Sequence, residues 1–293
     1  TLIPTPELPA GPAMPELSAG RPINISTIQM LDTQNGWGIG HQGESSDHIL
    51  FTQEGGLTWV DRSPPESAVP DAKQKAWAYF RDHLYVWVIY GPEAGTPPLE
   101  DPHIWFTNDG GQSWHPSQPL ATAGAESFFI PEGFAFIDET HGWLLVHVDA
   151  GMSHDYSYLY ATDNGGQTWE RIVDPYGSGL QSLHNTGIGF ADTHFGWVTK
   201  DNLGVMAGAF FEQTTDGGFT WEQVFLPAPS ELDWFEELSL CQTSSPTFPS
   251  FQTASLIVKC RLSGDQTIDY NAWSLTFIYT SLDRGSTWQY AQL

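Results

Sequence analysis

A short string recurs five times along the chain at near-regular spacing. It reads Ser or Thr, any residue, an acidic or amide residue, any residue, Gly, any residue, Ser or Thr, and Trp. The copies are TQEGGLTW (52–59), TNDGGQSW (107–114), TDNGGQTW (162–169), TTDGGFTW (214–221) and SLDRGSTW (281–288). Their starts differ by 55, 55, 52 and 67 residues, so the sequence predicts one supersecondary unit repeated five times.

The residue types of the string predict a tight β-turn followed by a strand. Gly at the fifth position supplies a backbone conformation that a Cβ would hinder, and the third residue can accept hydrogen bonds from the turn's own N–H groups. The closing Trp can fill the wedge between neighbouring sheets. We assign these strings a structural role, because a single binding site rarely needs five copies. The residues concerned are Thr52, Glu54, Gly56, Trp59, Thr107, Asp109, Gly111, Trp114, Thr162, Asn164, Gly166, Trp169, Thr214, Asp216, Gly218, Trp221, Ser281, Asp283, Gly285 and Trp288.

A second motif, Asp followed five residues later by Trp, precedes each of the first four strings. It reads DTQNGW (32–37), DHLYVW (82–87), DETHGW (138–143) and DTHFGW (192–197). The two motifs together predict four short strands in each of the five repeats. In the third repeat we expect them at 133–138, 142–148, 156–162 and 167–173.

The string resembles the Asp-box, or BNR, repeat, and over residues 23–293 the chain resembles Asp-box β-propellers. It looks most like the photosystem II assembly and stability factor type, and more distantly like sialidase and sortilin-type propellers. The resemblance implies an all-β fold of four-stranded antiparallel blades arranged radially. Five strings over this range give about 54 residues per blade, which favours five blades over six or seven. We therefore predict a single five-bladed β-propeller over 23–293.

The fifth repeat lacks the Asp-to-Trp motif and contains both cysteines of the chain. Cys241 and Cys260 fall on its first and second predicted strands. A cross-strand disulfide is the expectation for an exported protein, and two buried thiols are the alternative.

The first 22 residues hold six of the 21 prolines and predict a flexible tether. Such a lead suits an extracellular or cell-envelope protein, anchored by a lipid at an N-terminus that has been removed. A disordered boundary segment is the alternative. No run of eighteen apolar residues predicts a membrane span.

The chain is strongly acidic, with 35 Asp and Glu against 10 Lys and Arg and a formal charge of −25. This charge argues against nucleic acid and anionic membranes as direct partners. The long connections at the blade ends opposite the strings carry 18 acidic residues and five basic ones. We therefore expect an acidic loop face there.

Within these connections, ELDWFEEL (231–238) places Trp234 among four carboxylates. Asp233, Trp234 and Glu236 are the predicted ligand-binding residues. Trp77 and Trp273 are expected to be ordinary core residues.

Catalytic interpretations find less support, and no catalytic residue is predicted. A sialidase site needs three converging arginines, whereas the six arginines of this chain are scattered. They are Arg21, Arg62, Arg81, Arg171, Arg261 and Arg284. A glycosidase that uses two carboxylates stays open. Acid pairs such as Glu100 with Asp101 or Glu236 with Glu237 are, however, common in a chain of this charge.

A metal site is weighed at HVDAGMSHD (147–155), which gathers His147, Asp149, His154 and Asp155. These residue types suit zinc, but the spacing matches no known motif, and we interpret the segment as a polar loop. His141 and His194 are interpreted as turn residues. No metal or other cofactor is predicted; calcium at the acidic face is chemically reasonable but lacks a supporting motif.

Two functional hypotheses result. The first is a non-enzymatic, exported scaffold that binds a protein partner with a basic segment through the acidic loop face. The alternative is a carbohydrate-binding or glycosidase-like propeller that uses exposed aromatic residues. We expect a monomer in either case.

Overall fold

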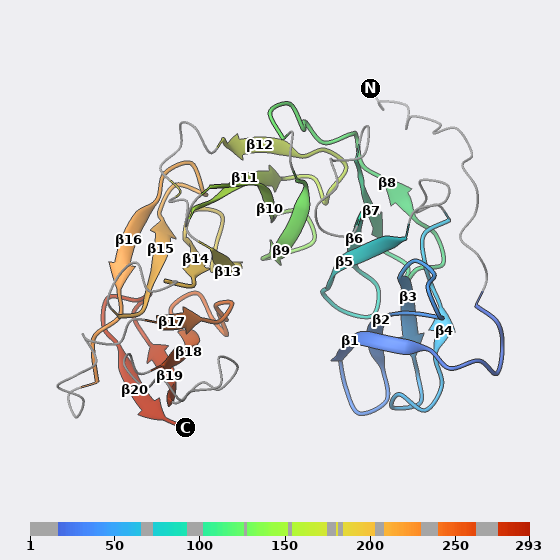
Figure 1. The fold of residues 1–293 in the computed structure, drawn as a ribbon, viewed down its shortest axis with the longest axis horizontal. Coiled ribbons are helices and arrows are strands. Elements are labelled where there is room, and N and C mark those ends of the chain that lie inside the picture. The colour runs from blue at the N-terminus through green and yellow to red at the C-terminus, as the bar shows by residue number, and fades with distance from the viewer. Residues whose placement is uncertain are drawn as a thin grey trace. The chain divides into compact units, whose positions relative to one another are not determined.

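The computed structural model describes residues 17–65, 73–92, 102–125, 128–151, 154–174, 180, 184–202, 208–229, 240–261 and 275–293. These residues form strands and turns, and none of them belongs to a helix that could cross a membrane. The strands make five four-stranded antiparallel sheets, each built from four strands that follow one another in sequence (Figure 1). The predicted all-β fold class is confirmed.

The strand bounds are as follows. Sheet 1 contains β1 (Asn24–Met30), β2 (Gly36–His41), β3 (His48–Thr52) and β4 (Val60–Asp61). Sheet 2 contains β5 (Gln74–Phe80), β6 (Val86–Pro92), β7 (Ile104–Thr107) and β8 (His115–Pro116). Sheet 3 contains β9 (Ile130–Phe136), β10 (Gly142–Gly151), β11 (His154–Thr162) and β12 (Glu170–Val173). Sheet 4 contains β13 (Asn185–Phe190), β14 (Gly196–Lys200), β15 (Phe210–Thr214) and β16 (Glu222–Phe225). Sheet 5 contains β17 (Leu240–Thr243), β18 (Ala254–Arg261), β19 (Leu275–Ser281) and β20 (Gln289–Gln292).

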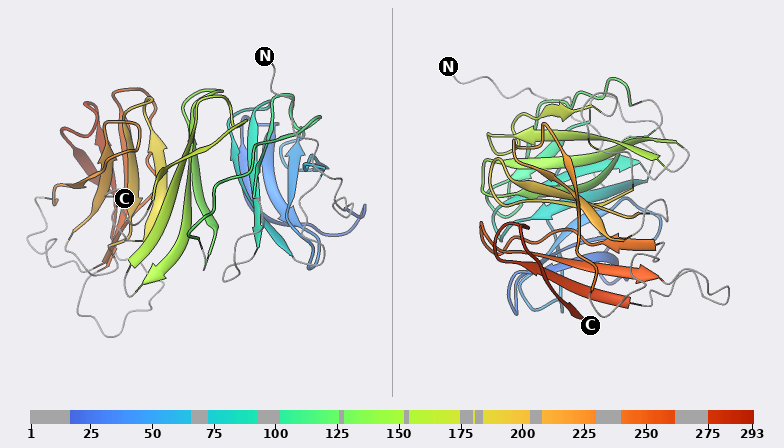
Figure 2. Two further views of the ribbon diagram at one scale, coloured as in Figure 1. Left: turned by 90° about the horizontal axis from the view of Figure 1, so that it is seen from above. Right: turned by 90° about the vertical axis from the view of Figure 1, so that its left-hand side faces the viewer.

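The chain divides into two compact units. Unit 1 comprises Thr1–Pro131 and Thr162–Glu170, and unit 2 comprises Glu132–Ala161 and Arg171–Leu293. Two further views show the twist of the strands within the individual sheets (Figure 2). The single domain over 23–293 stays a prediction.

Each of the five repeated strings, called a box from here on, forms a turn that its own side chains hold by hydrogen bonds. The box of sheet 2, Thr107–Trp114, shows these bonds. Thr107 Oγ1 accepts the backbone N–H of Gly111 at 3.0 Å, and Asp109 Oδ1 accepts the N–H of Ser113 at 2.9 Å. Ser113 Oγ donates to the other oxygen of Asp109 at 2.6 Å. Gly111 has a φ of 76°, in the left-handed region that favours glycine. All the bonds of the carboxylate lie within the turn, which gives the box a structural role.

The fourth box position shows why sheet 5 differs from the others. Gly110 has a φ of 75°, and a Cβ added there would meet the carbonyl oxygen of His83 at 2.9 Å. Sheet 5 has Arg284 at the equivalent position, with a φ of 59°. Its guanidinium pairs with Asp192 at 2.8 Å and lies over the ring of Phe251. These contacts offset a backbone cost of about 1 kcal/mol.

The tryptophans of the Asp-to-Trp motif join neighbouring sheets. In unit 1, the indole N–H of Trp37 on β2 donates to the carbonyl of Asp82 at 2.9 Å. In unit 2, Trp143 on β10 donates to the carbonyl of Gly217 in the box of sheet 4 at 2.9 Å. Both rings are buried. Each of these side chains therefore fills an interface between sheets and satisfies a backbone acceptor there.

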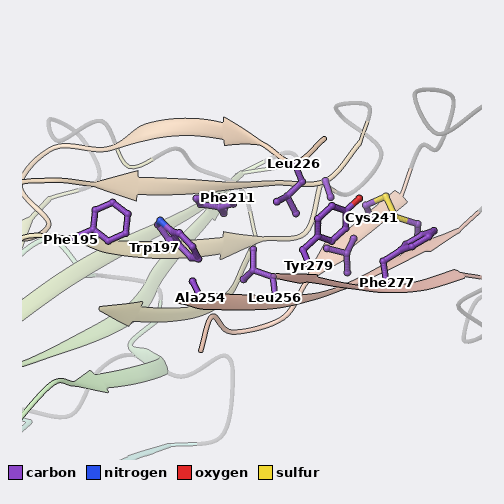
Figure 3. Close-up of a cluster of buried hydrophobic side chains, with 12 residues drawn as sticks. Phe195, Trp197, Phe211, Leu226, Cys241, Ala254, Leu256, Phe277 and Tyr279 are labelled. Carbon is purple, nitrogen blue, oxygen red and sulfur yellow. A yellow bond between two sulfur atoms is a disulfide. The ribbon is translucent and has the colours of Figure 1, made fainter. Parts of the chain in front are cut away.

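Aromatic packing continues between sheets 4 and 5 in unit 2 (Figure 3). Phe195 and Trp197 lie at one end of this core, and Tyr279 and Phe277 lie toward the other. There, Cys241 on β17 is in register with Cys260 on β18, and the two form a disulfide. Sheet 5 thus carries a covalent link between its first two strands.

We predict that Asp109 contributes stability that disappears in acid. Burial raises its pKa, but hydrogen bonds from Ser113, Thr107 and Gln112 outweigh this effect, and the pKa falls from 3.8 to about 2. Because the pKa is lower in the folded state, the contribution is complete above pH 4 and is lost as the pH falls toward 2. Asp109→Asn, which introduces the residue that the sheet 3 box has at this position, should cost about 0.5 kcal/mol at pH 7. The value is small because solvent screens this exposed group.

Urea unfolding of wild type and variant at pH 7, 4 and 2 measures this gap. Asp163→Asn, at the second position of the sheet 3 box, serves as the control for the loss of one exposed carboxylate in a box turn. A gap for Asp109→Asn that stays constant down to pH 2 would contradict the assignment.

Candidate functional site

A cluster of polar side chains lies between sheets 3 and 4, at the strand ends opposite the boxes. All of its members belong to unit 2. We call it the sheet 3–4 cluster, and it consists of Glu132, His147, Asp155, His184, Asn185, Lys200 and Glu212. The first three come from β9, β10 and β11, and the others come from sheet 4 or the residue before it.

The innermost members are Lys200 and Glu212. Both side chains are buried, and Lys200 Nζ lies 3.2 Å from Glu212 Oε2. Asn185 Oδ1 accepts a second hydrogen bond from Lys200 Nζ at 2.6 Å. Burial lowers the pKa of Lys200, and the charge of Glu212 opposes this effect. A buried pair of this kind recovers its desolvation cost only when both partners are present.

Asn185 links the buried Lys200 to Glu132 by hydrogen bonds to both side chains. Its Nδ2 group donates to Glu132 Oε2 at 2.8 Å and to Ser157 Oγ at 2.8 Å. Burial raises the pKa of Glu132, while the bond from Asn185 and the nearby His147 act in the opposite direction. Glu132 is therefore a desolvated carboxyl group held in a fixed orientation.

The outermost members reach solvent. His184 Nδ1 lies 2.7 Å from Asp155 Oδ2, and the His184 side chain is 47% exposed. This bond lowers the pKa of Asp155 and raises that of His184. His147 Nε2 lies 3.9 Å from Asp155 Oδ1 and 2.9 Å from the carbonyl oxygen of Asp149. The cluster thus runs from a buried ion pair to an accessible pair of an acid and an imidazole.

The cluster is not part of the repeat chemistry. The position of Lys200, three residues after the motif Trp, is occupied in sheets 1, 2 and 3 by Gly40, Tyr90 and Val146. The position of Glu212, two residues before the box, is occupied in the same sheets by Leu50, Trp105 and Tyr160. A scaffold role shared by the sheets therefore does not explain the buried charges.

Glu132, His147 and Asp155 are also the members that could hold a cation. One potential ligand atom from each lies within 4.8 Å of the others. The set offers one imidazole nitrogen and two carboxylate oxygens, donors that divalent transition metals accept.

The sequence identified part of this cluster. It placed His147 and Asp155 in one polar segment, and the structure brings them together. Asp149 contributes its backbone carbonyl, and the side chain of His154 lies outside the described residues. Glu132, His184 and the Lys200–Glu212 pair were missed because they come from other strands. The available signal was a lysine in the strand GWVTK.

Other predicted site residues lie outside the described part of the chain. This applies to Asp233, Trp234 and Glu236, so their ligand-binding role stays a prediction. The acid pairs, Trp273 and the side chain of Arg261 are also outside it.

Several remaining candidates can be placed. Trp77 is half-buried on β5, next to Gly91. His141 lies 2.8 Å from Asp138 in its turn, and His194 donates its backbone N–H to Asp192.

The described arginines of each unit serve separate local contacts. In unit 1, Arg62 donates to the carbonyl of Gly110, and Arg81 lies over Tyr85. In unit 2, Arg171 pairs with Asp174, while Arg284 pairs with Asp192 as described above.

Unit 1 has a second candidate site, a cavity of about 730 Å³. Its lining includes Trp59, Asp61, Gln42 and Arg21. Gln42 Nε2 donates to the carbonyls of Ser18 and Arg21, which fixes the wall formed by the end of the N-terminal segment. An aromatic ring beside planar polar groups is a combination that suits a small polar ligand.

Comparison with known proteins places the fold. No protein-family model matches the chain, and no curated protein matches it in sequence. A sialidase mutant of Trypanosoma rangeli displaying trans-sialidase activity is similar in structure at a TM-score of 0.51 and 12% identity. The match covers 94% of this chain and 50% of that sialidase. The fold is a five-bladed β-propeller.

Other solved structures match at lower TM-scores. YCF48 bound to a D1 peptide has a TM-score of 0.46 and 15% identity, over 98% of this chain and 86% of that one. The fucose-specific lectin from Aleuria aurantia has a TM-score of 0.48 and 10% identity, over 88% and 73%.

We predict that the Lys200–Glu212 pair behaves as a unit. Lys200→Met alone should cost about 3–5 kcal/mol, because it leaves Glu212 buried without a countercharge. Lys200→Met combined with Glu212→Leu, the residue that sheet 1 has there, should return to within about 1 kcal/mol of wild type. Chemical denaturation of the two single variants and the double variant measures the coupling. Additive losses in the double variant would show that the two charges do not interact.

Proposed function

We propose that this chain is an exported, non-enzymatic binding scaffold that recognises a cationic segment of a partner protein. The contact surface is the loop end of sheets 3 and 4, where the sheet 3–4 cluster reaches solvent. The proposal rests on the difference between the two strand ends. The box end repeats one closed turn, whereas the opposite end of sheets 3 and 4 carries charged groups that do not repeat. On a rigid scaffold, variable connections are where recognition resides.

The charge distribution favours a cationic partner. In unit 2, Lys200, Arg171 and Arg284 are each paired with a carboxylate of the same unit. Arg171 is the partner of Asp174 at the loop end, whereas Asp149 at that end lies in no ion pair among the described residues, within a chain of charge −25. Complementary charge increases the association rate and selects the partner.

The disulfide supports an exported location. Cys241 and Cys260 are the two cysteines of the chain, and they are bonded to one another. Disulfides of this kind persist in oxidising compartments and are rare in the cytosol.

We predict salt-sensitive binding of a fluorescent oligolysine peptide to the loop end. Raising the salt from about 50 to about 300 mM should weaken binding roughly tenfold, because ions screen exposed charges. Asp149→Lys with Asp174→Lys should abolish binding at low salt. Fluorescence anisotropy measures both effects.

The matched control reverses two exposed acids of unit 2 near the box turns, Glu139→Lys with Glu222→Lys. It changes the net charge by the same amount and should retain most of the binding. Equal losses in both variants would mean that the peptide senses only the overall charge and would refute the loop-end surface.

A glycan ligand is the second candidate function, and the cavity of unit 1 favours it. Trp59 supplies an aromatic surface, and Asp61 is held in place by His48 at 2.7 Å and by Ser63 at 2.6 Å. Stacking on a sugar ring is apolar and should survive high salt. On a glycan array, Trp59→Leu should lose a salt-resistant signal that the equivalent box variant Trp114→Leu retains. An array without any such signal removes this candidate.

A further inference from the structure

We propose that Glu132, His147 and Asp155 bind a divalent transition-metal ion, with Zn²⁺ as the representative. This site goes beyond the protein-binding role, because neither a peptide nor a glycan is needed to fill it.

The geometry brings three donors together from three neighbouring strands of one sheet. Glu132 lies on β9, His147 on β10 and Asp155 on β11. Their potential ligand atoms all lie within 4.8 Å of one another. A zinc ion lies about 2.1 Å from each nitrogen or oxygen ligand, so small side-chain rotations suffice to close this triangle around it.

Both carboxylates are oriented by groups from the neighbouring sheet. Asn185 Nδ2 donates to Glu132 at 2.8 Å, and His184 Nδ1 contacts Asp155 at 2.7 Å. Metal ligands are commonly held by such outer hydrogen bonds, which fix their orientation and tune their affinity. The outer bonds leave the second oxygen of each carboxylate available for an ion.

The charge balance favours a cation. Two carboxylates approach one another in a partly buried place, and the nearest lysine, Lys200, is paired with Glu212. One imidazole and two carboxylates suit Zn²⁺ or Mn²⁺ better than Cu⁺, which prefers sulfur ligands. Three protein ligands would leave a position for water.

Among sheets 1 to 4, only sheet 3 has a glutamate and a histidine together at the positions of Glu132 and His147. Six residues before the motif Asp, where sheet 3 has Glu132, sheets 1, 2 and 4 have Ser26, Ala76 and Thr186. Four residues after the motif Trp, where sheet 3 has His147, they have His41, Gly91 and Asp201. His41 of sheet 1 therefore has no glutamate beside it at the equivalent position. This makes His41 a matched control for His147.

The test uses the full oxidised chain, treated with EDTA and dialysed against buffer. Both cysteines are in the disulfide, so thiols do not compete for the probe. Isothermal titration with Zn²⁺ should give one site per chain. Glu132→Gln, His147→Gln and Asp155→Asn should each weaken binding at least tenfold. His184→Gln, which removes an orienting bond, should weaken it about 10-fold to 100-fold.

The controls separate this site from surface histidines and acids. His41→Gln and Asp149→Asn should bind Zn²⁺ as wild type does. If Glu132→Gln unfolds, as judged by circular dichroism, His147→Gln and Asp155→Asn decide the outcome. The visible spectrum of the Co²⁺-loaded protein gives a second readout and should change in the His147 variant.

Two results would overturn the site. The first is the absence of Zn²⁺ binding tighter than about 100 μM, which corresponds to a free energy of only about −5.5 kcal/mol. The second is binding that His147→Gln and Asp155→Asn leave unchanged. In either case the cluster is an internal hydrogen-bond network without an ion.

Discussion

The structure depends on a hydrogen bond from an indole N–H to a backbone carbonyl of the next sheet, which three of the four motif tryptophans make. The fourth, Trp197, donates to Gln213 Oε1 of its own sheet at 3.1 Å. Trp37 reaches Asp82, Trp87 reaches Gly165 and Trp143 reaches Gly217, each at 2.9 Å. The bond requires the next turn to present its carbonyl at a fixed place. This requirement explains why the box and the Asp-to-Trp turn both satisfy their own N–H groups, since a turn closed by its own side chains holds its outward carbonyl still. Stability thus accumulates between nearest neighbours, as in other repeat architectures.

Fixing one end of the strands leaves the other end free to vary. At the box ends of the sheets the turns have nearly the same residues and hydrogen bonds. The box carboxylates accept backbone N–H groups of their own turns. At the opposite end, sheet 4 replaces an apolar pair of positions with Lys200 and Glu212, and sheet 3 adds Glu132 and His147. Such a substitution is tolerated because the apolar core between the sheets continues toward the box end through Val198, Ile188 and Trp143. The fold therefore separates the part that holds the sheets together from the part available for recognition.

The sequence predicted the fold well, because the information was local and repeated. Each box contains its whole turn within eight residues, and the spacing of the boxes determined the number of sheets. The polar cluster could be predicted only in part. His147 and Asp155 are close in sequence, but Glu132 meets them through the pairing of β9 with β10 in sheet 3. Lys200 comes near them only through the packing of sheet 4 against sheet 3. No local pattern encodes either contact. The loop with Trp234 lies outside the described residues, so the most specific ligand prediction stays a prediction.

Asp192 has two roles that belong to different sheets. One of its carboxylate oxygens accepts the N–H groups of His194 and Phe195 in its own turn, and the other binds Arg284 of sheet 5. Arg284 in turn occupies a backbone conformation that other sheets reserve for glycine. Neither residue can change alone without disturbing both sheets. Among descendants of this sequence, positions 192 and 284 should therefore vary together, and a return to glycine at 284 would free Asp192 to become Asn or Ser.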